Sequence, residues 1–83
     1  MPDDGPSISV LAGQLAYLID DEPALARATD DELAARLNHN DRFARARERY
    51  PLDNDEQIAE RVSEFPERIT PAMVHEARVA MPE

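Results

Sequence analysis

Apolar residues in this chain recur every three or four positions, and this spacing limits what the chain can fold into. Between residues 8 and 19 they stand along one helical stripe: Ile8, Leu11, Leu15, Leu18 and Ile19. No segment alternates apolar and polar residues for long enough to form part of a sheet. The sequence therefore predicts an all-α fold, a small compact bundle of about four to five short helices.

Capping residues and prolines mark where these helices begin and end. Thr29-Asp30-Asp31-Glu32 has the form of a capping box and opens a helix with Leu33, Ala34 and Leu37 on its buried face. Asp53 is expected to cap a later helix that stops at Pro66, and Thr70-Pro71 starts the last one. Helices are thus predicted over 7–20, 29–37, 42–50, 53–65 and 70–81, with a short helical turn at 23–28.

The polar run at 38–41 is interpreted as a break between two helices. On the helix predicted after it, Phe43 lies on a side that anchors the helix to the core. A neighbouring side, within about 60° at 100° per residue, carries Arg42, Arg45 and Arg49. This arginine side is expected to face water or a partner.

Length and charge narrow the class of protein further. A chain of 83 residues forms one core, and without cysteine it has no disulfide to stabilise that core. Helix packing must therefore supply the stability, or a second chain must add to it, as in a homodimer. The net charge is −9, and every basic residue is arginine. Residues 36–49 hold five arginines against two acids, which leaves −12 for the rest of the chain. Such a charge disfavours indiscriminate binding to nucleic acid.

Targeting and membrane signals are sparse. The longest apolar stretch, residues 8–19, is shorter than the roughly 20 residues of a membrane span, so no membrane partner is expected. The opening Met1-Pro2-Asp3-Asp4 is acidic where a secretory signal is basic, and the expected location is cytoplasmic. Residues 1–6 are predicted to be a disordered start, and 7–83 a single helical domain.

Residues 31–47, Asp31-Glu32-Leu33-Ala34-Ala35-Arg36-Leu37-Asn38-His39-Asn40-Asp41-Arg42-Phe43-Ala44-Arg45-Ala46-Arg47, resemble a helix-turn-helix DNA-binding module. Leu33 and Leu37 match the helix anchors, Ala34 the small residue where two helices approach, and Asn38 the turn. Arg47 departs from the pattern, because the family generally keeps that site apolar. The resemblance implies a small regulatory DNA-binding protein. A second segment of similar form, 56–81, has a longer turn than the family uses.

Guanidinium groups bind phosphate and guanine edges through paired hydrogen bonds, so the candidate nucleic-acid-binding residues are Arg36, His39, Arg42, Arg45 and Arg49. The partner in that hypothesis is DNA. The alternative is an acidic protein–protein interaction module, or inhibitor, that binds a basic partner protein. An arginine face that is merely solvated also fits the same residues.

Catalytic and metal-binding patterns are missing from the sequence. His39 and His75 lie on different predicted helices without the spacing of metal ligands, so no metal is expected. The serines lack a nucleophile motif, and the two glycines form no phosphate loop. Paired acids such as Asp30-Asp31 are expected to complement helix ends. The sequence predicts a protein that is not an enzyme and uses no cofactor.

Overall fold

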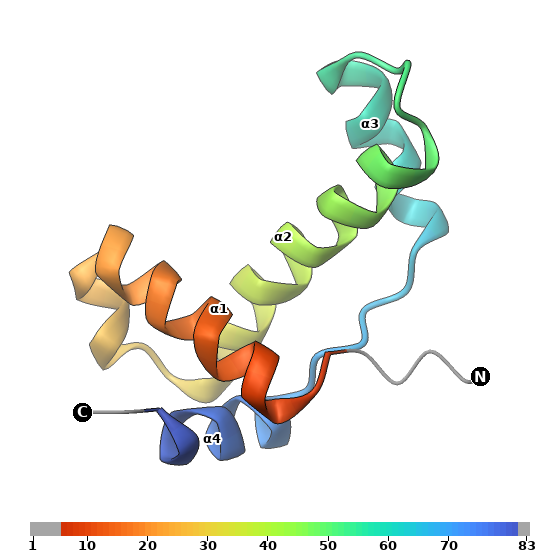
Figure 1. Cartoon of the computed structure of the whole chain (residues 1–83). Helices are drawn as coiled ribbons and strands as arrows, with labels where there is room; N and C mark the ends of the chain where they lie inside the picture. The colour runs from red at the N-terminus through yellow and green to blue at the C-terminus, as the bar shows by residue number, and fades with distance from the viewer. Residues whose placement is uncertain (1–5, 82–83) are drawn as a thin grey trace.

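The computed structural model describes residues 6–81, in which six helical elements follow one another and no strand occurs (Figure 1). They are α1 (Ile8–Asp21), the 3₁₀ turn η1 (Pro23–Arg27), α2 (Asp30–Arg49), α3 (Asp55–Arg61), the 3₁₀ turn η2 (Val62–Glu64) and α4 (Pro71–Ala80). The all-α prediction is confirmed. The predicted disordered start lies, except for Pro6, outside the described residues.

Side-chain caps begin four of these helices, because the first backbone N–H groups of a helix need acceptors. Ser7, Thr29 and Thr70 accept from the backbone at the predicted starts of α1, α2 and α4. The predicted Asp53 cap is wrong. Asn54 caps α3 instead, because its side chain and that of Gln57 bond reciprocally to each other's backbone N–H at 2.9 Å.

Helix α2 runs unbroken from Asp30 to Arg49, so the predicted break at 38–41 is wrong. No glycine or proline lies within it, and polar residues alone do not end a helix when their side chains find partners. Asn38 is buried against another segment, and Asp41 forms an i,i+4 ion pair with Arg45. Residues 31–47 therefore contain one helix rather than two helices and a turn.

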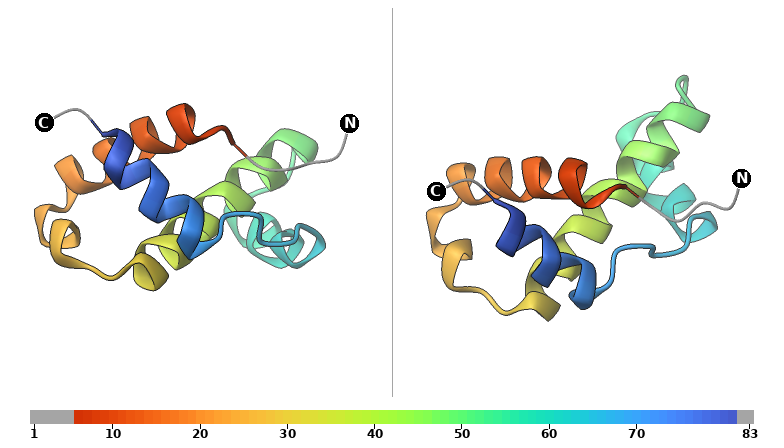
Figure 2. Two further views of the ribbon diagram at one scale, coloured as in Figure 1. Left: turned by 90° about the horizontal axis from the view of Figure 1, so that it is seen from below. Right: turned by 60° about the horizontal axis from the view of Figure 1, so that its bottom comes forward.

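The core lies where α1, α4 and the first half of α2 meet (Figures 1 and 2). Leu11 and Leu15 of α1 are fully buried there, with Leu33 of α2 and Val74 of α4. Burial of each such side chain contributes about 1.5–3 kcal/mol. The predicted buried face of α2 is confirmed at Leu33, Ala34 and Leu37, and Val74 and Ala77 of α4 are buried as well.

The second half of α2 extends away from this core and carries α3 and η2, as Figure 1 shows. Ala46 and Ile58 are buried at this contact. The helix predicted over 53–65 is shorter in the structure: α3 ends at Arg61, and residues 62–64 form η2 before Pro66. From Phe65 to Thr70 the chain then runs back along α2 to reach α4 (Figure 2). We call residues 65–70 the return segment.

Candidate functional site

The predicted arginine side of α2 faces the return segment and the turn before it. Arg42 donates from Nε and Nη2 to the carbonyl oxygen of Val62, at 3.2 and 2.9 Å. Arg45 donates to the carbonyl oxygen of Pro66, and its guanidinium carbon lies 5.5 Å from the centre of the Phe65 ring. The expectation that this side faces water or a partner is corrected for these two residues, because residues 62–66 already lie against it.

Asp41 joins two arginines on the same side of α2. Its carboxylate accepts two hydrogen bonds from Arg68, Nε to Oδ2 at 3.0 Å and Nη2 to Oδ1 at 2.8 Å. Arg45 Nη2 lies 2.8 Å from Asp41 Oδ2. Only 11% of the Asp41 side chain is exposed, against 14% for Arg45 and 23% for Arg68. Bidentate geometry and partial burial make this network stronger than a typical surface pair.

The side-chain amide of Asn38 forms hydrogen bonds with the backbone of the return segment, as a neighbouring β-strand would. Its Nδ2 donates to the carbonyl oxygen of Ile69 at 2.7 Å, and its Oδ1 accepts from the backbone N–H of Ile69 at 2.9 Å and of Arg68 at 3.2 Å. Asn38 is 4% exposed, and Ile69 equally little. The amide thus satisfies buried backbone groups that no helix or sheet would satisfy.

These four side chains share one face of α2, at the helical spacing i, i+3, i+4 and i+7. We call them the clamp face: Asn38, Asp41, Arg42 and Arg45. Every one of them bonds to residues 62–69. Two predicted nucleic-acid-binding residues are therefore part of an internal contact: Arg42 holds η2 against α2, and Arg45 holds the return segment there.

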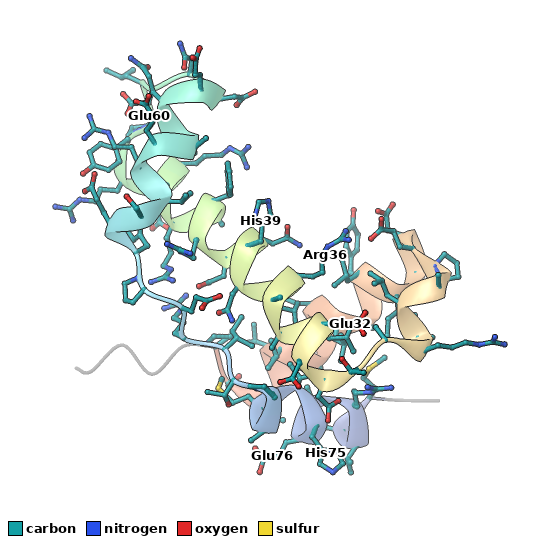
Figure 3. The ribbon with its side chains drawn as sticks, turned by 180° about the vertical axis from the view of Figure 1, so that it is seen from behind. Glu32, Arg36, His39, Glu60, His75 and Glu76 are labelled. Carbon is teal, nitrogen blue, oxygen red and sulfur yellow. The ribbon has the colours of Figure 1, made fainter. Side chains whose placement is uncertain are left out.

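The other candidate residues lie elsewhere on α2. Arg36 forms an ion pair with Glu22, next to the end of α1, and projects roughly 180° around the helix from Arg45. His39 is exposed, with its ring 4.7 Å from that of Phe43, and points away from α4 in Figure 3. Arg49 is exposed near the Tyr50 ring. The five predicted residues do not form one surface.

At the far end of α2, a small polar cluster joins the helix to η2. The Tyr50 hydroxyl donates to Glu64 Oε1 at 2.6 Å, and Arg61 lies over the Tyr50 ring at 4.3 Å. Arg61 also bonds to Asp53 and Glu64. The Tyr50 hydrogen bond, followed by the one from Arg61, lowers the pKa of Glu64 below its ordinary value. The Asp53 hydrogen bond raises the pKa of Arg61.

Replacing Tyr50 with phenylalanine should raise the pKa of Glu64 toward its ordinary value, because the first cause of its lowering is removed. Since the folded pKa is the lower one, the contribution of Glu64 to stability is present above its unfolded pKa and is lost as the pH falls through the folded pKa. Carboxyl ¹³C chemical shifts followed during acid titration measure this. Tyr17→Phe is the control and should leave Glu64 unchanged; an equal pKa in Tyr50→Phe and wild type would contradict the assignment.

A groove of about 630 Å³ lies between α1 and α2. It is lined from α1 by Gly13, Tyr17, Leu18 and Asp21, and from α2 by residues that include Leu37 and Ala44. Tyr17 is 78% exposed. We call this the α1–α2 groove. Pockets of roughly this volume bind drug-sized ligands or side chains of a partner.

The described part of the chain holds neither a cluster of metal-ligating side chains nor a helix that could span a membrane. Within residues 6–81, no three His, Cys, Asp or Glu side chains converge as a metal site would need. His75 lies 3.7 Å from Asp30, a contact of one histidine with one carboxylate. Among the helices described, none has the length and apolar character to cross a membrane.

No protein-family model, curated protein or solved structure matches this chain significantly.

Sequence reasoning missed both the clamp face and the α1–α2 groove. The clamp face does have a signal in the sequence, because Asn38 and Asp41 repeat the spacing of Arg42 and Arg45 and so belong to the same side of one helix. Gly13 is the signal for the groove, since it is the one glycine inside the predicted stripe of the first helix.

Proposed function

We propose that this protein is a small acidic protein-interaction module that binds a basic partner protein. One observation carries the proposal: most arginines form ion pairs or hydrogen bonds within the chain, whereas many carboxylates form no ion pair with the described residues. Seven of the nine arginines form an ion pair with a carboxylate or a hydrogen bond to a backbone carbonyl oxygen of the described residues: Arg36, Arg42, Arg45, Arg47, Arg61, Arg68 and Arg78.

Acids without an ion pair among the described residues are spread over all four α-helices and the return segment. Across residues 6–81, no ion pair forms to these exposed acids: Asp20, Asp21, Asp31, Glu48, Glu56, Glu60, Glu67 and Glu76. Figure 3 shows Glu60 and Glu76 at opposite ends of the molecule. An approaching molecule thus meets a surface of net negative charge, and such a field steers positively charged partners toward it.

The DNA-binding hypothesis has less support from the same contacts. Arg42 and Arg45 would have to give up bonds to residues 62–66 before they could bind phosphate. Arg36 is paired with Glu22. Arg49 and His39 are exposed, but two such groups are few for a duplex that repels a chain of net charge −9.

Affinity capture from an extract of the native host tests the proposal with two variants. The first carries Asp20→Asn, Asp31→Asn, Glu60→Gln and Glu76→Gln, which keep size and remove charge. It should capture the basic partner about tenfold less well at low salt, because steering by charge is lost. The second carries Arg47→Ala and Arg49→Ala and should capture the partner as wild type does. The reverse pattern would overturn the proposal.

A further inference from the structure

We infer that the α1–α2 groove binds a basic amphipathic helix of the partner protein. This inference rests on the proposed function and adds the site and the form of the segment that binds there. Three features of the described residues carry it: the apolar surface along the groove, a glycine that the fold itself does not require, and carboxylates gathered at one end.

The apolar surface follows α1 at the spacing of a helix. Tyr17 lines the groove and is 78% exposed. Val10 does not line it, but it lies seven residues earlier on the same side of α1 and is 52% exposed, so it extends the apolar surface beyond the groove. Leu18 and Leu37, which are 8% and 3% exposed, line the groove between the two helices. An amphipathic helix uses anchors at this periodicity when it binds in a groove. Tyrosine is also enriched among residues that dominate binding energy.

Gly13 lies in the middle of α1 and lines the groove. A glycine inside a helix lowers stability by about 0.5–1 kcal/mol relative to alanine. Nothing within 4 Å would meet a Cβ atom at this position, so packing within the chain gives no reason for glycine. A partner whose backbone approaches α1 closely at this point gives such a reason.

The acidic residues at the end of α1 favour a positively charged partner. Asp20, Asp21 and Glu22 gather where α1 ends, and the last turn of α1 carries no basic residue. Carboxylates are unfavourable there, because the helix dipole already places negative charge at that end. Of these three acids only Asp21 lines the groove, and it forms no ion pair in the described chain. Arg36 lines the groove as well, but it is paired with Glu22, as its position in Figure 3 near this end of α1 allows. A lysine or arginine of the partner would complement Asp21.

A second copy of this chain fits this surface poorly. It would bring its own net charge of −9 and its own carboxylates toward the same acidic end. Strand addition is disfavoured too, since the described residues contain no sheet edge to extend. A positively charged helix with apolar residues along one side satisfies both the apolar surface and the acidic end.

The test uses the whole chain and a fluorescent synthetic peptide of about 18 residues, long enough to form a helix. The peptide has leucine at helical spacing and lysine elsewhere; a control peptide has glutamate in place of lysine. Binding is followed by anisotropy at low and physiological salt. The variants are Gly13→Ala and Asp21→Asn, with Glu76→Gln on α4 as the control that removes the same charge at a distance.

The basic peptide should bind wild type, and the acidic one should not. Gly13→Ala should raise the melting temperature by about 2–6 °C yet weaken binding about tenfold, a combination that damage to the fold cannot produce. Asp21→Asn should weaken binding about threefold or more at low salt, and Glu76→Gln less than twofold, roughly as screened charges behave.

Four outcomes would overturn the inference. The first is equal affinity for the two peptides. The second is unchanged binding in Gly13→Ala, and the third is equal effects of Asp21→Asn and Glu76→Gln. The fourth is association of the chain with itself that the peptide does not displace. If host partner capture still depends on the exposed acids in any of these cases, the proposed function stands and only the groove is wrong.

Discussion

Replacing Asp41 with alanine should lower the free energy of unfolding by about 2–3 kcal/mol, and the melting temperature by roughly 10–20 °C. The change removes both Arg68 hydrogen bonds and the Arg45 ion pair, and it leaves two largely buried guanidinium groups without this carboxylate. Alanine's better helix propensity offsets only about 0.5 kcal/mol. Chemical denaturation, with thermal unfolding beside it, measures the loss.

Glu48→Ala is the matched control for Asp41→Ala. Glu48 is an exposed acid on the same helix and has no ion pair among the described residues. Its removal should change the free energy of unfolding by less than about 0.5 kcal/mol. Equal effects of the two substitutions would mean that the Asp41 network does not hold the return segment.

Replacing Asn38 with alanine should cost about 2 kcal/mol, because the buried N–H and carbonyl groups of Ile69 lose their hydrogen-bond partners and gain none. The expected loss in melting temperature is roughly 8–16 °C. Hydrogen exchange adds a local measurement: in Asn38→Ala, the backbone amide of Ile69 should exchange faster than the core amides of α1.

Asn40→Ala serves as the control for Asn38→Ala. Asn40 is exposed two residues further along α2 and should tolerate alanine, which forms helices better than asparagine does. Should Asn38→Ala unfold with the same free energy as Asn40→Ala, the pairing of Asn38 with the return segment contributes nothing to stability.

Local signals along the chain predicted most of the fold. The apolar stripe of α1, the threonine caps of α2 and α4 and the proline at the start of α4 depend on neighbours a few residues away, and the structure confirms them. Asp53 and Asn54 are both good caps in sequence, and only the reciprocal bond with Gln57 distinguishes them.

The continuity of α2 could not be predicted in this way. The polar run 38–41 looks like a turn unless its partners are known, and those partners lie about 30 residues further along the chain. The same is true of the arginine side. The same arginine pattern in a sequence can face water or can face backbone carbonyl oxygens. Only the path of residues 62–66 shows that Arg42 and Arg45 face carbonyl oxygens here.

Charge in this protein therefore has two roles. Its arginines connect segments that are distant in sequence, as Arg78 does between α4 and Asp30 at the start of α2. Its surplus carboxylates remain at the surface, and on the proposal above they attract the partner. Substitution of an arginine should accordingly affect stability first, and substitution of an exposed acid should affect binding first.

Nuclease treatment of the host extract before affinity capture tests the central claim most directly. We predict that the captured partner is a basic protein, that its recovery is unchanged by nuclease, and that it falls about tenfold when the four exposed acids are neutralised. Recovery of duplex DNA, with loss of every captured protein after nuclease, would contradict the claim and favour DNA binding.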